Sequence, residues 1–281
     1  MPPTTKDVIQ STSALLWGHC VAFAIHLGMI IGLAIVWADR TIYYLQLPKI
    51  KFDGPDTGPK IVGLLKYNYT FDIVAIGLAM EIITALHHLG FAIYIGTQGL
   101  DGKGRYLKYG FNPLKWIEYG ITSGLGMCVA MFWHGQNSLY VVGLAFILLF
   151  TTNMFGLLAE YMFVMRHEFK KRVEKTYLAT LAPWVSFEMG FVPFLGAWIV
   201  AWSSLSRIDT DGMPDWVWAL IIGLVVLYAA FPMWMSLYFC KATNCCCGNM
   251  MFGAVSEIGY IVLSASAKVF LVAILISGAV V

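Results

Sequence analysis

A single lysine stands near the middle of the last apolar stretch of the chain. Lys268 lies about half way between Ala254 and Val281, and the residues that end at it read YIVLSASAK. A charged side chain at that depth in a membrane costs ~2.5 to 3.5 kcal/mol on insertion scales, so it is expected to have a function and a partner. A buried amine can form a Schiff base with an aldehyde, which is how lysines carry carbonyl cofactors. A lysine that snorkels or pairs for structure alone is the alternative interpretation.

Glu118, in the third apolar stretch, is the partner that the sequence offers for this amine. A Schiff base that carries a proton is a buried cation, and a buried cation requires a nearby anion. Thr122 lies one helical turn after Glu118, and Ser264 lies one turn before Lys268, so each charge is expected to have a hydroxyl beside it. The alternative is that Glu118 is a carboxylate at a helix end that faces water.

Five further ionisable residues fall in apolar stretches and form a candidate proton path: His26, Glu81, His88, Glu188 and Glu257. At such depth, ionisable side chains usually face the interior of a bundle and mark water or proton paths. A hydrogen-bonded polar cluster without transport is the alternative. The sequence has no HExxH or CxxC spacing, so we expect no metal site.

Three aromatic residues surround a proline in the sixth apolar stretch, which reads LYAAFPMWM. Pro232 is tolerated in a helical bundle and bends the helix, while Tyr228, Phe231 and Trp234 offer flat apolar surfaces. Ordinary core packing explains aromatic residues at helical spacing equally well. Beside the lysine, however, they are expected to form the wall of a pocket for a long polyene.

The elements that must position these residues are seven membrane-spanning helices. The chain has 281 residues, of which 59% are hydrophobic and only 12% are charged, and its mean hydropathy is +0.73. These values indicate an all-α membrane protein, and we expect residues 1–281 to form one domain. Seven windows are apolar enough to cross a hydrocarbon layer of ~30 Å, near residues 14–37, 71–96, 113–133, 139–165, 177–202, 214–240 and 254–280.

The basic residues of the short connections predict how this bundle is oriented. The connections after the third and fifth windows contain a single basic residue, Arg207. Those after the second, fourth and sixth windows contain Lys103, Arg105, Lys108, Arg166, Lys170, Lys171, Arg172, Lys175 and Lys241. Because Lys and Arg accumulate on the cytoplasmic side, we expect a cytoplasmic N-terminus and an extracellular C-terminus.

The long first connection, residues 38–70, departs from that charge pattern, since it carries five basic and three acidic residues. Its prolines and glycines separate short apolar pieces such as TIYYLQL and IVGLL. Turn residues placed in this way favour a hairpin over disorder. We therefore expect a small extracellular hairpin that caps the outer face.

Charge and cysteine content exclude other classes. The formal net charge is +2 and there is no basic tract, so no nucleic-acid partner is expected. Six cysteines do not make a disulfide framework here, since Cys20 and Cys128 fall inside apolar windows and the other four cluster around one connection. Cys245, Cys246 and Cys247 are plausible sites of S-palmitoylation beside a cytoplasmic helix end, with reduced thiols as the alternative.

Three motifs together resemble those of the heliorhodopsins, and the similarity covers essentially the whole chain. The motifs are YIVLS followed four residues after Ser264 by Lys268, WIEY at 116–119, and TALHHL at 84–89. The resemblance implies that Lys268 holds all-trans retinal with Glu118 as counterion, and that Ser264 and Thr84 hydrogen-bond around the Schiff base. It places His26 and His88 in a polar cavity on the cytoplasmic side and implies a homodimer. The chain departs from the family pattern at Gly120, Glu81 and Glu188.

The resemblance and the residues together predict a photoreceptor, which is not an enzyme and acts on an unidentified cytoplasmic signalling partner. The alternative is a light-activated proton transporter or channel, because the extra carboxylates Glu81 and Glu188 are groups that a proton path would use. A structural seven-helix protein without a chromophore is the third interpretation.

Overall fold

The computed structural model describes residues 5–36, 42–51, 60–98, 112–134, 136, 138–169, 177–206, 215–242 and 254–279. These residues form seven helices and two strands. The helices are α1 (Thr5–Val36), α2 (Ile73–Gln98), α4 (Pro113–Trp133), α5 (Leu139–Phe169), α6 (Tyr177–Leu205), α7 (Asp215–Ala242) and α8 (Ala254–Ala279). The protein is thus the all-α membrane bundle that the apolar windows predict.

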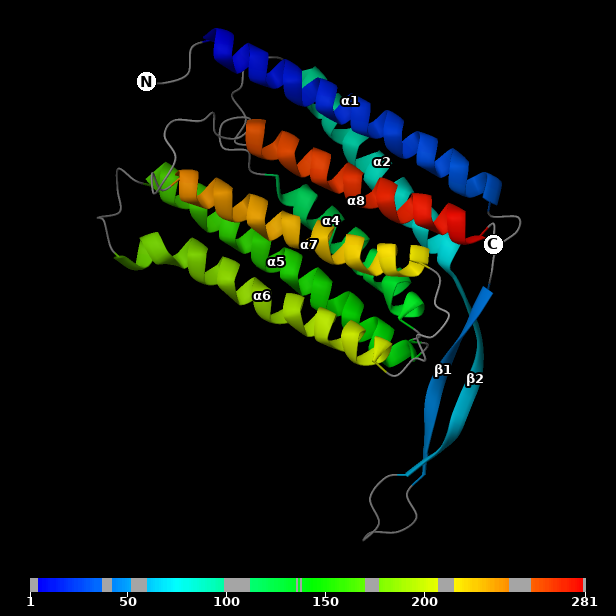
Figure 1. The fold of residues 1–281 in the computed structure, drawn as a ribbon. Coiled ribbons are helices and arrows are strands. Elements are labelled where there is room, and N and C mark those ends of the chain that lie inside the picture. The colour runs from blue at the N-terminus through cyan, green and yellow to red at the C-terminus, as the bar shows by residue number, and fades with distance from the viewer. Residues whose placement is uncertain are drawn as a thin grey trace.

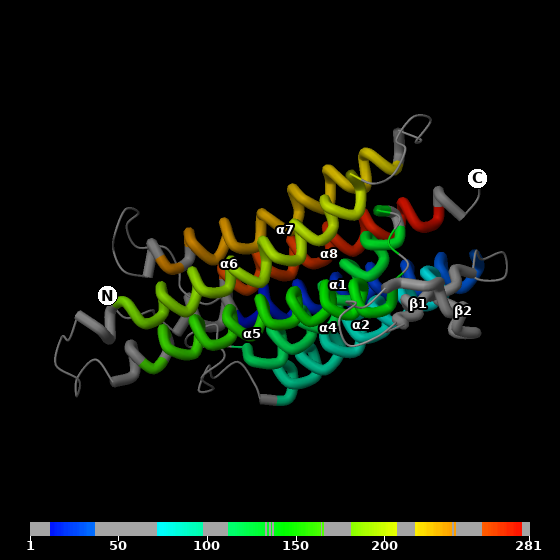
Figure 2. Tube along the Cα trace, turned by 90° about the horizontal axis from the view of Figure 1, so that it is seen from below, coloured from blue at the N-terminus to red at the C-terminus, as the bar shows by residue number. Residues whose placement is uncertain are grey.

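The helices lie side by side along one long axis, with the start of α1 and the end of α8 at opposite ends of the bundle (Figure 1). Neighbouring pairs in contact include α1 with α2 and α8, α4 with α2 and α5, α5 with α6, and α7 with α8. The view turned by 90° shows the same side-by-side arrangement (Figure 2). We call the end where α1, α4, α6 and α8 begin the N-terminal end of the bundle, and the opposite end the C-terminal end.

Six of the described helices are long and apolar enough to cross a bilayer, namely α1, α2, α5, α6, α7 and α8. Their outer faces carry exposed apolar side chains such as Ile35, Val192 and Met233, as expected for contact with lipid. The seventh helix, α4, is buried by protein over most of its length. It therefore needs fewer apolar side chains than a helix that faces lipid.

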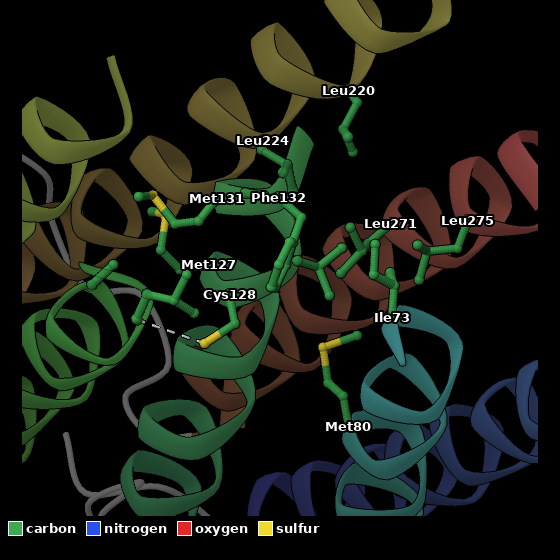
Figure 3. Close-up of a cluster of buried hydrophobic side chains, with 14 of the residues drawn as sticks. Ile73, Met80, Met127, Cys128, Met131, Phe132, Leu220, Leu224, Leu271 and Leu275 are labelled. Carbon is green, nitrogen blue, oxygen red and sulfur yellow. Dashed lines mark hydrogen bonds between the residues drawn. The ribbon is translucent and has the colours of Figure 1, made fainter. Parts of the chain in front are cut away.

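Side chains of α4 form the centre of the largest hydrophobic core. Met127, Val129 and Met131 are fully buried. Figure 3 shows Met127 and Met131 near Leu224 of α7, and the same cluster includes Leu271 of α8. The unbranched methionine side chains fill the irregular space between helices that cross one another.

The two strands, β1 (Ile42–Lys51) and β2 (Lys60–Asp72), pair in antiparallel fashion. Ile42 lies opposite Asp72, and Lys51 lies opposite Lys60. The pair lies at the C-terminal end of the bundle and extends away from it (Figure 1). The tip of the connection, residues 52–59, lies outside the described residues, and the assignment of this end to the extracellular side stays a prediction.

The first helix is longer than the apolar pattern indicates, because it begins at Thr5 and not near residue 14. The part that is apolar enough to span a membrane begins only at Thr12. The polar residues before it can continue the helix in water, since a helix satisfies its own backbone hydrogen bonds in either environment.

Candidate functional site

Lys268 of α8 and Glu118 of α4 form a buried ion pair. The distance from Lys268 Nζ to Glu118 Oε1 is 2.6 Å, and the two side chains are only 8% and 4% exposed. Lys268 Nζ also donates to Ser264 Oγ at 3.0 Å, one turn earlier on the same helix. The structure therefore brings together the two charges that sequence analysis paired, although they lie far apart in the chain.

Hydroxyl groups from two helices hold the carboxylate of Glu118. Thr84 Oγ1 of α2 donates to Glu118 Oε1 at 2.6 Å, and Thr122 Oγ1 donates to the same oxygen at 3.2 Å. Glu118 Oε2 is buried and has no hydrogen-bond partner among the described residues. Since buried carboxylate oxygens normally accept hydrogen bonds, this atom has acceptor capacity left for a group or a water that enters the site.

A cavity lies beside the ion pair, and Lys268, Ser264 and Thr122 line it. Its walls come from α2, α4, α5, α6, α7 and α8. Most of the lining is apolar, and the aromatic residues in it are Trp116, Tyr119, Phe187, Phe191, Phe194, Tyr228, Phe231 and Tyr260. A buried amine beside a mostly apolar, aromatic cavity suits an apolar carbonyl compound, to which an amine can bind covalently.

Small residues of α4 allow the neighbouring helices to approach. A side chain at Gly124 would meet the Phe146 ring of α5 at 2.6 Å, and one at Gly126 would meet the hydroxyl of Tyr228 at 2.8 Å. Gly126 itself lines the cavity. The absence of side chains at these positions lets aromatic rings of α5 and α7 lie directly against α4.

Of the three aromatic residues expected from α7, two line the cavity and one does not. Tyr228 and Phe231 are in the wall, together with Pro232. Trp234 is absent from the lining: its Nε1 donates to the carbonyl of Ser256 at 3.0 Å, and its ring packs on Gly259. Trp234 thus joins α7 to the start of α8.

Three of the proton-path candidates meet at the interface of α1 and α2. His26 Nδ1 lies 2.6 Å from Glu81 Oε2, and both side chains are fully buried. The rings of His26 and His88 stack with centroids 5.4 Å apart. A fourth member is His19, whose Nδ1 lies 2.9 Å from Nδ1 of His88.

The other two candidates, Glu188 and Glu257, lie elsewhere. Glu188 is exposed on α6, next to Phe187, which lines the cavity. Glu257 is buried and pairs with Lys115 at 3.0 Å. The structure therefore does not join these two carboxylates to the histidines.

The contacts of Glu257 show residues that sequence analysis did not select. Lys115 Nζ also binds Glu160 Oε1 at 3.1 Å, and Asn112 Nδ2 donates to Glu257 Oε1 at 3.1 Å. Glu160 lies inside an apolar window, which is the signal that selected Glu188. Lys115 stands at the start of an apolar window, and the basic residues of the connections do not include it. The cysteines at 245–247 lie outside the described residues.

Comparison with known proteins finds one family. The model of the Heliorhodopsin family matches residues 22–280, a range that contains the ion pair, the cavity lining and the histidine cluster apart from His19. No curated protein matches the chain. The family is one of membrane-embedded rhodopsins, whose cofactor is retinal, and the cavity lining and the buried amine fit that cofactor.

Proposed function

This chain belongs to the heliorhodopsin family, and we propose that it is a photoreceptor in which Lys268 holds all-trans retinal as a protonated Schiff base and Glu118 is the counterion. The observation that carries the proposal is the buried pair of Lys268 and Glu118 at the wall of an aromatic cavity. Retinal, when bound, supplies the absorption of light and a change of shape on absorption. The roles of the surrounding residues follow from their contacts.

Glu118 balances the positive charge on Lys268, and its position is fixed by the hydroxyls of Thr84 and Thr122. Ser264 accepts a hydrogen bond from Lys268 Nζ and keeps the amine on the side of α8 that faces Glu118. A hydroxyl therefore stands where a second carboxylate could lie. The amine thus contacts one carboxylate and one hydroxyl, and not two carboxylates. This arrangement gives little reason to expect directional proton pumping, so it favours a sensor.

Absorption spectroscopy of the purified chain tests this proposal. Addition of all-trans retinal to the wild type should produce a visible band, because a protonated Schiff base forms on Lys268. Lys268→Ala should lack the band, since it has no amine at that position. A colourless wild type would end the photoreceptor proposal. Extraction and chromatography of the bound retinal from dark protein would identify the isomer.

A second candidate, light-activated proton transport, has its own observation. His19 and His88 lie with ring nitrogens 2.9 Å apart, His88 stacks on His26, and His26 pairs with Glu81. Thr84, which donates to Glu118, lies three residues after Glu81 on α2. Nitrogen or oxygen atoms of His26, His88, Glu81 and Glu118 lack partners in the described part of the chain, and waters could bridge them. Such a series can relay protons.

Photocurrents in voltage-clamped cells separate the two functions. A transporter should give light-dependent currents that fall in Glu81→Gln, where the series loses its carboxylate. Loss of current in Glu188→Gln would instead indicate a path along α6. Absence of current at every voltage would support the sensor.

We also propose that the N-terminal end of the bundle faces the cytoplasm, that the chain forms a homodimer, and that a cytoplasmic partner receives the signal. The distribution of Lys and Arg in the short connections supports the orientation. Family membership supports the dimer.

A further inference from the structure

A second group of buried charges lies at the N-terminal end of the bundle. Lys115 of α4, Glu160 of α5 and Glu257 of α8 form what we call the Lys115 triad. Nζ of Lys115 donates to Glu160 Oε1 at 3.1 Å and to Glu257 Oε2 at 3.0 Å. All three residues are at most 2% exposed. The triad thus ties three helices together.

Each of the four carboxylate oxygens in the triad accepts a hydrogen bond. Lys115 serves one oxygen of each glutamate. Trp116 Nε1 donates to Glu160 Oε2, and Asn112 Nδ2 donates to Glu257 Oε1. Asn112 is also the N-cap of α4, because its Oδ1 accepts a hydrogen bond from the backbone N–H of Lys115 at 3.0 Å. Charged hydrogen bonds of this kind are the strong ones, so the five side chains are held in one arrangement.

The triad is in direct contact with the wall of the cavity. Trp116 and Tyr260 both line the cavity. Lys115 Nζ lies 4.3 Å from the centre of the Tyr260 ring and 5.1 Å from that of Trp116. These distances are within the range of cation–π attraction. Neither aromatic ring can move far without a change in its contact with the triad.

The two rings are also held on their other sides. Their centroids lie 5.7 Å apart in an edge-to-face arrangement. The Trp116 ring packs on Gly156 of α5, where a side chain would collide with it. The hydroxyl of Tyr119 donates to the backbone carbonyl of Tyr260 at 3.1 Å. Because the rings are packed on the sides that face away from the cavity, a displacement of the wall in that direction must change these contacts.

We propose that Lys115, Glu160 and Glu257 are positioning residues, which fix Trp116 and Tyr260 in the cavity wall and pass movement of that wall to the N-terminal end of the bundle. The segments that would respond are the starts of α4 and α8 and the end of α5. The inference rests on the proposed function, since it concerns the cavity that holds the cofactor. It adds a route by which a change at the cavity reaches the surface where a partner would bind.

Hydrogen exchange measured by mass spectrometry tests the coupling. The full chain is compared in the retinal-free, dark and illuminated states. Light should raise exchange in peptides that cover 113–120 and 254–260. Glu160→Gln should raise exchange in the same peptides even without light, both in the retinal-free chain and in the dark state. The expected increase is about tenfold, which is the effect of one lost charged hydrogen bond on a local opening equilibrium.

Two matched variants separate positioning from general stability. Glu257→Gln removes one contact of Lys115 but keeps the bond from Trp116 to Glu160, so it should shift the dark absorption maximum less than Glu160→Gln. Lys115→Arg keeps a cation that donates to both glutamates, so exchange in these peptides should stay as low as in the wild type. A purely structural tether would lower thermal stability in the two glutamine variants and leave the absorption maximum and the light-dependent exchange as in the wild type.

The outcomes are distinguishable from those of the proposed function. A wild type without a visible band would overturn the photoreceptor itself. A wild type with a normal band, but with equal exchange in these peptides in light and dark, would overturn only the coupling. That comparison uses the unmodified chain, so it decides the matter even where Glu160→Gln fails to fold.

Discussion

The ion pair of Lys268 and Glu118 is the residue-scale feature on which the chemistry depends. Removing one member of a buried pair leaves the other charge without compensation, at a cost of about 3 to 5 kcal/mol. The hydroxyls of Thr84, Thr122 and Ser264 add hydrogen bonds around the pair. The arrangement therefore stabilises the positive charge of Lys268 at a buried position where an unpaired charge would be strongly destabilising.

Replacement of the counterion should remove most of the visible band. In Glu118→Gln the cation on Lys268 loses its anion, and about 3 kcal/mol of lost stabilisation changes an equilibrium by roughly a hundredfold. We therefore expect the retinal-loaded variant to absorb mainly in the near ultraviolet at pH 7. Glu118→Asp keeps a carboxylate and should retain visible absorption. A Glu118→Gln protein with a wild-type spectrum would show that another group balances the charge.

Two aromatic residues of α7, three positions apart, should differ in their effect on the pigment. Phe231 lines the cavity and Trp234 packs against α8. Phe231→Ala should shift the absorption maximum, because it changes the wall. Trp234→Ala should leave the maximum in place and lower thermal stability, since a large side chain is lost from a helix contact. Absorption spectra and thermal melts of both variants check this, and a spectral shift confined to Trp234→Ala would contradict the assignment of the wall.

At the scale of elements, the close packing of α4 on α5 sets the shape of the cavity. Glycines at helix contacts leave room for Phe146, Phe150 and Trp116. A helix that carried side chains at those positions would have to move outward by the width of a methyl group, and the core would lose contacts on both sides.

Replacing a glycine of α5 by alanine should therefore disturb the site at Gly156 but not at Gly143. Gly156→Ala forces Trp116 out of its position, so it should destabilise the protein by about 1 to 3 kcal/mol and shift the absorption maximum. Gly143→Ala is the matched control, because nothing lies within 4 Å of the added atom. It should be neutral or stabilising by about 0.5 to 1 kcal/mol through higher helix propensity. Melting curves and spectra measure both, and equal effects of the two variants would refute the packing argument.

At the scale of the whole molecule, the odd number of described helices places the start of the first helix and the end of the last helix at opposite ends of the bundle (Figure 1). The strand pair lies at the C-terminal end. Function as a sensor depends on which of these ends meets the cytoplasm, because a signalling partner must reach it.

Epitope tags at the two ends test the orientation. A tag at the N-terminus of the chain should be labelled by antibody only after the cells are permeabilised, while one at the C-terminus should be labelled on intact cells. The reason is the concentration of Lys and Arg in the connections at the N-terminal end. The opposite labelling pattern would reverse the assignment of the triad to the cytoplasmic side.

The oligomeric state is a separate prediction at this scale. Purified protein in lipid nanodiscs should have twice the chain mass by native mass spectrometry, as family membership suggests. A single chain mass at all concentrations would contradict the homodimer and leave the site within one chain unaffected.

The sequence by itself determined the number of helices and the central pair of charges. Seven apolar windows predicted the seven helices, and the cost of a charge at membrane depth was the reason to expect a partner for Lys268, with Glu118 as the candidate. The motifs around these two residues also carried the resemblance to the family that the comparison then found.

Tertiary structure alone decided which of the remaining residues meet. Helical periodicity places residues on one face of a helix, but the direction of that face depends on rotation about the helix axis, which packing determines. Glu257 therefore joins Lys115 and Glu160 and not the histidines, while Trp234 turns away from the wall that Phe231 forms. Glu188, one residue after a cavity side chain, lies on the exposed surface of α6 for the same reason.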